Sequence, residues 1–78
     1  MKTAYSITEI GEVFDMSVSH LKYHLTKNRH IVPTKVGKRK FYSASDVMQI
    51  AAYFLTQFGS AHRNRLMAEK FLGTLVVA

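Results

Sequence analysis

The chain has 78 residues, 47% of them hydrophobic and 21% charged, and no cysteine. These values describe one small globular domain and exclude both a disordered chain and a disulfide scaffold. Eleven Lys and Arg residues stand against five Asp and Glu, which gives a net charge of +6. So basic a small domain is typical of nucleic-acid binders, although composition alone equally fits a basic protein that has no specific partner.

A capping box opens the first expected helix. The Ser6 hydroxyl can accept a hydrogen bond from the Glu9 N–H while the Glu9 side chain reaches back to Ser6. Apolar residues follow at helical spacing, at positions 7, 10, 13 and 14. We therefore expect a helix over residues 7–14, followed by a turn at Asp15, a residue type that tolerates left-handed backbone.

A second short helix is expected after Ser17, the next N-cap residue. Val18, Leu21 and Leu25 form an apolar stripe at i, i+3 and i+7. We expect this helix to run to about residue 27 and to stop at Asn28. Two short helices joined by a turn of about three residues indicate a helix-turn-helix.

A β-hairpin is expected after Pro33, which ends any helical pattern there. The β-prone runs 34–36 and 39–42 flank the pair Gly37-Lys38, a combination that favours a tight turn. We expect Val36 and Phe41 to point inward while the lysines point outward.

The strongest helical periodicity follows a second capping box at Ser43 and Asp46. Apolar residues recur at positions 47, 50, 51, 54, 55 and 58, and Gly59 is expected to stop the helix. A last helical segment is expected over residues 61–72, with Gly73 at its end. The expected core comprises Ile7, Ile10, Phe14, Val18, Leu21, Leu25, Val36, Phe41, Val47, Ile50, Ala51 and Phe54.

These elements together predict a mainly α fold, a winged helix-turn-helix with three to four helices and a two-stranded β-hairpin wing. We expect the DNA-binding domain to occupy residues 1–58. Residues 59–78 are expected to form a C-terminal helical extension and a candidate self-association segment.

Two sets of side chains suit DNA. In a helix-turn-helix, the second helix presents polar groups to base edges and cations to phosphates. The expected recognition-helix residues are Ser17, Ser19, His20, Lys22, Tyr23 and Lys27. The expected wing residues, crowded around the turn, are Lys35, Lys38, Arg39 and Lys40. The alternatives are a solvated helix face and a Lys-rich edge strand that blocks aggregation.

The last segment carries an apolar side formed by Leu66, Met67, Phe71 and Leu72, continued by Leu75. This side either packs on the preceding helix or is shared with a second copy of the chain. We expect sharing, because specific DNA sites usually need more contacts than one such small domain supplies.

The sequence gives little support for a metal site or a catalytic site. His20 and His24 stand at i and i+4, but no third ligand is fixed nearby, so we expect no metal site. His24 is expected to pack against the wing or a phosphate. The few carboxylates are better explained as caps and turn residues than as catalytic groups, so we expect neither an enzyme nor a cofactor.

The residues from Tyr5 to Ile10 and from Ser17 to Tyr23 resemble the N-terminal DNA-binding domain of the MerR family. The likeness continues through Pro33, the Gly37 turn and residues 41–47, and covers about residues 5–58. The family resemblance implies a winged helix-turn-helix in which Lys22 and Tyr23 touch DNA. The wing arginine of the family aligns with Lys40, with Arg39 one residue away. The wing is shorter than in full-length MerR regulators, and the family's long dimerisation helix, effector domain and metal-binding cysteines have no counterpart here.

We therefore expect a sequence-preferring double-stranded DNA-binding protein that acts as a small transcriptional regulator. Phage and plasmid excisionases and some terminase small subunits share this fold, so a recombination directionality factor and a phage DNA-packaging adaptor remain alternatives. A protein-interaction module such as an anti-repressor is an alternative of another class. Expected partners are DNA, further copies of the chain, and another regulator or a recombinase. With no apolar targeting or membrane-spanning segment in the sequence, we expect a cytoplasmic location and no membrane association.

Overall fold

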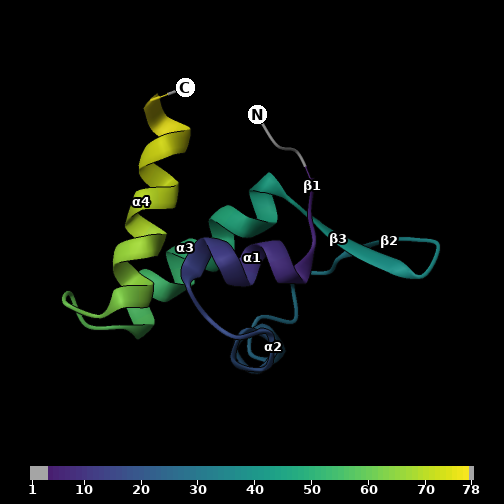
Figure 1. Ribbon diagram of the computed structural model, residues 1–78, viewed down its shortest axis with the longest axis horizontal. Coiled ribbons are helices and arrows are strands. Elements are labelled where there is room, and N and C mark those ends of the chain that lie inside the picture. The colour runs from purple at the N-terminus through teal and green to yellow at the C-terminus, as the bar shows by residue number, and fades with distance from the viewer. Residues whose placement is uncertain (1–3, 78) are drawn as a thin grey trace.

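The computed structural model describes residues 4–77, with side chains as far as residue 74. It is mainly helical, with four helices and a small antiparallel sheet in the described part of the chain (Figure 1). None of the described helices is long and apolar enough to cross a bilayer. In chain order the elements are β1 (Ala4–Tyr5), α1 (Ile7–Phe14), α2 (Val18–Thr26), β2 (Thr34–Val36), β3 (Arg39–Ser43), α3 (Ala44–Gln57) and α4 (Arg63–Val77).

The sheet has three strands in the order β1-β3-β2, one more than the expected two-stranded hairpin. In β1, Ala4 lies opposite Ser43 and Tyr5 lies opposite Tyr42. A strand of two residues is too short to show an alternating pattern, so it could not be recognised before folding. Because β1 pairs with the end of β3 next to the core, it holds that end of the hairpin against the body of the molecule. The turn between β2 and β3 projects away from α4 (Figure 1).

Both capping boxes are confirmed. The Ser6 Oγ accepts from the Glu9 N–H at 3.2 Å, and Glu9 Oε1 accepts from the Ser6 N–H at 2.9 Å. The box of Ser43 and Asp46 is formed in the same way at 3.1 and 3.2 Å. Each box satisfies backbone donors that a helix start leaves unpaired, which explains why α1 and α3 begin where the sequence indicates.

The turn between α1 and α2 depends on Gly11 and Asp15. Asp15 takes the left-handed conformation, with φ of 54°, and closes α1. The Met16 N–H donates to the Gly11 carbonyl oxygen at 2.9 Å, which draws the outgoing chain against the helix. A Cβ atom at Gly11 would lie 2.8 Å from the Met16 carbonyl oxygen. Glycine is therefore required at this close backbone approach.

The core lies among α1, α3, α4 and the base of the sheet. Of the expected core residues, Ile10, Phe14, Leu21, Val47, Ile50, Ala51 and Phe54 are buried, while Ile7, Val18, Leu25 and Phe41 are half-buried. The prediction for Val36 is wrong, because its side chain is 62% exposed. Val36 stands beside the turn of a hairpin that extends beyond the packed body, so no element covers it. Buried apolar residues outside the expected core are Tyr5, Ile31, Tyr42, Ala68 and Phe71.

Helix α4 packs against α3 and α1 and brings Ala68 and Phe71 into the same core. Asn64 fixes its start, since the Nδ2 group donates to the Phe14 carbonyl oxygen at 2.6 Å and to that of Asp15 at 3.2 Å. The expected stop at Gly73 is wrong, because the helix continues to Val77. Glycine is only a weak helix breaker when the hydrogen-bonding pattern continues on both sides of it.

The burial of Phe71 also corrects the expected self-association face. Phe71 is only 9% exposed and cannot reach a second copy of the chain, whereas Leu66 is 49% exposed. Met67 and Leu72 are half-buried, and the side chain of Leu75 lies outside the described part of the structure. For Phe71, the largest of these side chains, the structure therefore shows packing within the chain and not sharing with a second copy.

We expect Gly11→Ala and Gly73→Ala to have opposite effects on stability. At Gly11 the added methyl meets a backbone oxygen that cannot rotate away, so overpacking outweighs the gain in helix propensity, for a net loss of about 1–2 kcal/mol. At Gly73 nothing lies within 4 Å of the added Cβ, and we expect a gain of up to about 1 kcal/mol. Urea denaturation of the two variants measures both changes, and equal stabilisation would contradict the close approach at Gly11.

We expect Phe71→Ala and Leu66→Ala to separate core packing from an exposed apolar face. Truncation of the buried ring should lower the free energy of unfolding by about 3–5 kcal/mol. Truncation of the half-exposed Leu66 should lower the free energy of unfolding by less than about 1 kcal/mol. Thermal or urea unfolding at two protein concentrations makes the measurement, and a Phe71→Ala protein as stable as wild type would place Phe71 outside the core.

Candidate nucleic-acid interface

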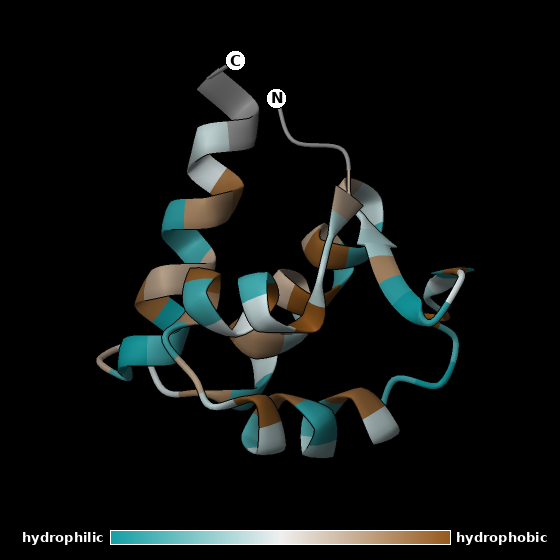
Figure 2. Cartoon of the chain, turned by 45° about the vertical axis from the view of Figure 1, so that its right-hand side comes forward, coloured by the Kyte–Doolittle hydropathy of each residue, from teal (hydrophilic) through white to brown (hydrophobic). Residues whose placement is uncertain are grey.

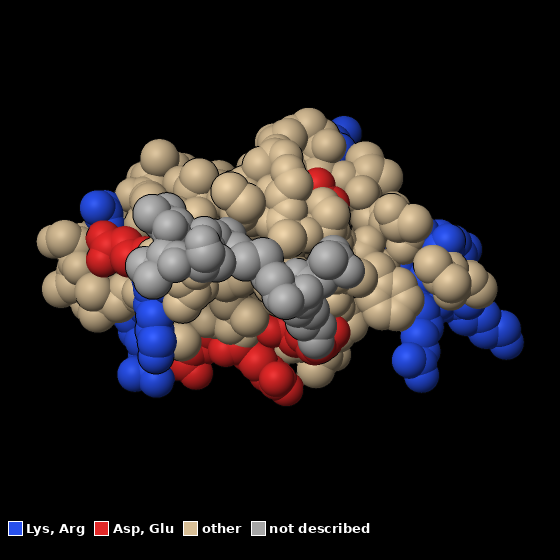
Figure 3. Space-filling model, turned by 90° about the horizontal axis from the view of Figure 1, so that it is seen from above, with Lys and Arg blue, Asp and Glu red and all other residues tan. Residues whose placement is uncertain are grey.

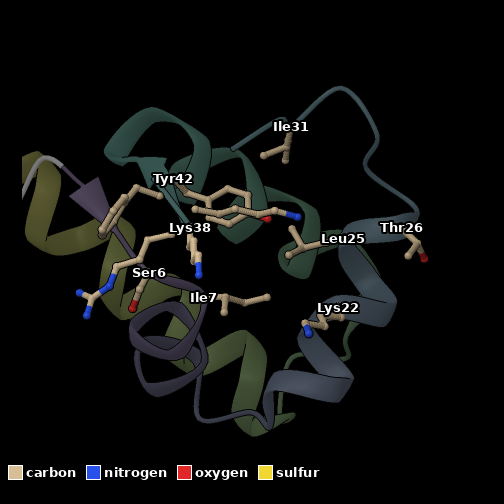
Figure 4. Close-up of a pocket in the computed structure, with 11 residues that line it drawn as sticks. Ser6, Ile7, Lys22, Leu25, Thr26, Ile31, Lys38 and Tyr42 are labelled. Carbon is tan, nitrogen blue, oxygen red and sulfur yellow. The ribbon is translucent and has the colours of Figure 1, made fainter. Parts of the chain in front are cut away.

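A cleft of about 770 Å³ separates α2 from the β2–β3 hairpin (Figure 4). The start of α1 forms its third side, and the loop that leads from α2 to β2 contributes one residue. The cleft is lined by Ser6, Ile7, Lys22, Leu25, Thr26, Ile31, Lys38, Arg39, Lys40, Phe41 and Tyr42.

Four cations stand around this cleft. Lys22 reaches it from α2, and Lys38 reaches it from the opposite side (Figure 4). Arg39 and Lys40 add two more charges from the hairpin, and all four side chains are exposed. Beneath the cations the lining is apolar and more buried. Cations above an apolar floor suit a chain of phosphates joined by less polar sugars, because each part meets a group of matching character.

The hairpin turn concentrates charge of one sign. Gly37 has φ of 63° while Lys38 has no positive φ, which is the pattern of a type II′ turn. Lys35 lies directly opposite Lys40 in the antiparallel register. Residues directly opposite one another point to the same face, and two like charges in that position destabilise the pair. A bound anion would relieve this repulsion.

The exposed face of α2 carries the remaining polar side chains expected to bind DNA. Ser17 caps the helix, its Oγ accepting from the His20 N–H at 3.2 Å. Ser19, His20 and Lys22 are exposed along the first half of the helix, where α2 runs below the body of the molecule (Figure 2). Tyr23 is 55% exposed. Of these residues Lys22 lines the cleft, while the others are exposed on the rest of the α2 surface.

Further along α2, Lys27 is held against Tyr23. The Lys27 Nζ lies 4.6 Å from the centre of the Tyr23 ring, within the range of a cation–π contact. A side-chain hydrogen bond with Tyr23, together with the electrostatic interaction with that residue, raises the pKa of Lys27. Lys27 therefore carries its full charge at neutral pH, in a position limited by its neighbour.

The structure places His24 in the core and not at the interface. The prediction that it packs against the wing or a phosphate is wrong, because it is only 8% exposed and packs among aromatic rings. Its ring centre lies 5.3 Å from that of Phe54 and 5.5 Å from that of Phe58, and its Nδ1 lies 3.2 Å from the Tyr53 hydroxyl. Burial, with smaller contributions from the charges of His20 and Lys27, lowers the pKa of His24. Its role in the fold is to attach α2 to α3.

Acidic side chains lie beside cations on α4 but not at the hairpin end. Figure 3 shows Lys and Arg at both ends of the molecule, next to acidic side chains at the end away from the hairpin and without them at the hairpin end. On α4, Arg65 pairs with Glu69 at 3.2 Å, and Arg63 pairs with Asp15 of the α1–α2 turn. Among the described residues no carboxylate pairs with Lys38, Arg39 or Lys40. The cations of the cleft are therefore available to an external anion.

Part of the cleft has no signal in the sequence. The sequence indicates only a capping role for Ser6 and no site role for Thr26 or Ile31, yet all three line the cleft. They come from three separate segments, so no local pattern in the sequence could bring them together. The hydroxyl of Thr26 donates to the Tyr23 carbonyl oxygen at 2.6 Å, which leaves its lone pairs free to accept.

Comparison of the chain with models of protein families, with curated proteins and with solved structures found no match.

Proposed function

We propose that the protein binds double-stranded DNA as a winged helix-turn-helix, with α2 as the recognition helix and the β2–β3 hairpin as the wing. The observation that carries the proposal is the cleft between these two elements. Lys22 stands on one side of it and Lys38, Arg39 and Lys40 on the other, without acidic partners among the described residues. The resemblance of residues 5–58 to the MerR DNA-binding domain supports the same assignment.

The arrangement suggests how a duplex would be held. An α-helix fits the major groove, and the exposed Ser19 and His20 would reach base edges from the first half of α2. One sugar–phosphate strand would then lie in the cleft, where Lys22 and the hairpin cations neutralise its phosphates. The exposed turn at Gly37 would reach the next groove or its backbone. This division assigns sequence preference to α2 and most of the affinity to the cleft.

We propose the role of a small transcriptional regulator. An excisionase-type recombination factor and a DNA-packaging adaptor would use the same surface, and DNA binding is the function common to all three. The alternative of a protein-interaction module depends on the apolar side of α4. The burial of Phe71 removes the largest side chain from that surface, which favours DNA over a protein partner for the main site.

We expect affinity for duplex DNA to fall steeply with salt. Four cleft cations together with Lys27 and Lys35 would neutralise four to six phosphates, so log K should fall against log salt with a slope of roughly −4 to −5. Fluorescence anisotropy of a labelled duplex between low and moderate salt gives the slope. A slope close to zero would show that the basic cleft does not bind DNA.

We expect variants of the hairpin to lower the affinity for DNA and variants of α2 to lower the sequence preference. Lys38→Ala and Arg39→Ala should weaken binding to all duplexes alike and reduce the slope by about one each. Ser19→Ala and His20→Ala should reduce the difference in binding free energy between a duplex selected from a random pool and an unrelated duplex. The expected narrowing is about 1–3 kcal/mol for each base edge that the variant no longer reads.

Lys70→Ala is the matched control for this experiment, because it removes an exposed lysine from α4, away from the cleft. It should leave both the salt slope and the sequence preference unchanged. If the hairpin and α2 variants lose affinity in the same way, or if Lys70→Ala equals Lys38→Ala, the assignment of roles is wrong.

A further inference from the structure

His20 and His24 bring two imidazole nitrogens together on α2. Their Nε2 atoms lie 3.1 Å apart, and their ring centres are 4.8 Å apart. The two residues are one helical turn apart, so both rings leave the same face of the helix. The i, i+4 spacing alone does not predict a site, but the structure brings the Nε2 atoms of the two rings together.

The separation of the two nitrogens suits a shared metal ion. With metal–nitrogen bonds of about 2.0–2.1 Å, two nitrogens 3.1 Å apart subtend about 95–102° at the metal. This angle lies close to the right angle between neighbouring ligands in the square-planar and tetragonal sites of Cu²⁺ and Ni²⁺. The tetrahedral angle that Zn²⁺ prefers is about as close to this range, so the separation suits either geometry.

A second interaction holds one ring ready to bind. The Tyr53 hydroxyl lies 3.2 Å from His24 Nδ1 and can accept a hydrogen bond from it. A proton on Nδ1 leaves the lone pair on Nε2, the atom that faces His20. This is the outer-sphere hydrogen bond that orients most metal-binding histidines in proteins.

We propose that His20 and His24 form a bidentate site for one divalent transition-metal ion that imidazole binds well, such as Ni²⁺, Cu²⁺ or Zn²⁺. His20 is exposed and gives the ion access, while His24 is fixed by its aromatic neighbours. No group of three or more His, Cys, Asp or Glu side chains comes together in the described part of the chain, so water would complete the coordination shell. When the ion binds, the Nε2 proton of His20 moves to its Nδ1 through exchange with water, and no net proton is released.

The metal site can be tested without DNA, because both rings and Tyr53 belong to the free chain. The competing explanation is that the two rings only share a hydrogen bond. The same 3.1 Å approach fits both explanations, and the effect of added metal separates them.

The test is calorimetric titration of the chelator-treated full chain with NiCl₂, without DNA. We expect one ion per chain, and at least tenfold weaker binding to His20→Ala, which removes an exposed ring and should leave the fold intact. His30→Ala removes another exposed histidine that lies outside the pair, and it should bind Ni²⁺ as the wild type does. Equal affinity in the wild type and His20→Ala would overturn the proposal.

A second measurement covers the buried partner, whose truncation could unfold the chain. Paramagnetic Ni²⁺ should broaden the imidazole NMR signals of His20 and His24 at lower metal concentration than those of His30 and His62. Tyr53→Phe keeps the ring but removes the acceptor for His24 Nδ1, and should weaken Ni²⁺ binding by about tenfold. Broadening centred on His30 or His62, or on all four histidines equally, would show adventitious binding and overturn the proposal.

Discussion

The meeting of three helices on the Phe14 ring supports the rest of the structure. Phe14 is fully buried at the end of α1, and its ring makes edge contacts with Phe54 of α3 at 5.1 Å and Phe71 of α4 at 5.9 Å. Aromatic rings in this geometry gain an electrostatic contribution beyond the area they bury. A domain of this size has few such contacts, so the removal of one ring affects the whole fold. Asn64 satisfies the carbonyl oxygens that leave this junction, which keeps a helix end buried without an unpaired acceptor.

The position of the candidate interface follows from this junction. The chain turns sharply at Asp15, directly after Phe14, and Gly11 lets Met16 pass close to α1, so the direction of α2 is set there. The opposite side of the cleft is held by Tyr42, which is anchored in the core and lines the cleft together with its neighbours on β3. The distance between Lys22 and the hairpin cations is therefore a property of the packed body and not of either element alone.

His24 connects the core with the proposed chemistry of α2. The contacts that bury it against Phe54 and Phe58 are the same ones that aim its Nε2 toward His20. If His20 reads a base, its ring cannot also hold a metal ion through the same nitrogen. The two proposals thus describe alternative uses of one exposed histidine, and the occupied state would depend on the relative concentrations of metal and DNA.

Local signals in the chain account for most of the secondary structure. Capping boxes at Ser6 and Ser43, helical apolar spacing and the Gly37 turn act within a few residues, so α1, α2, α3 and the β2–β3 hairpin lie where these signals indicate. The cations of the candidate interface were also evident, because charge on a short loop is exposed in almost any fold. These effects are short-range, and they do not depend on which segments later pack against the element.

Which apolar residues are covered depends instead on packing between distant segments. Val36 and Phe71 look equally apolar in the sequence, but Val36 lies on a projecting hairpin and Phe71 lies under α1 and α3. The strand β1 exists because β3 has a free edge beside it, and α4 continues past Gly73 because nothing interrupts its hydrogen bonding. The cleft and the orientation of His24 likewise need the folded chain, since packing rather than any local preference brings Lys38 and Tyr53 to α2.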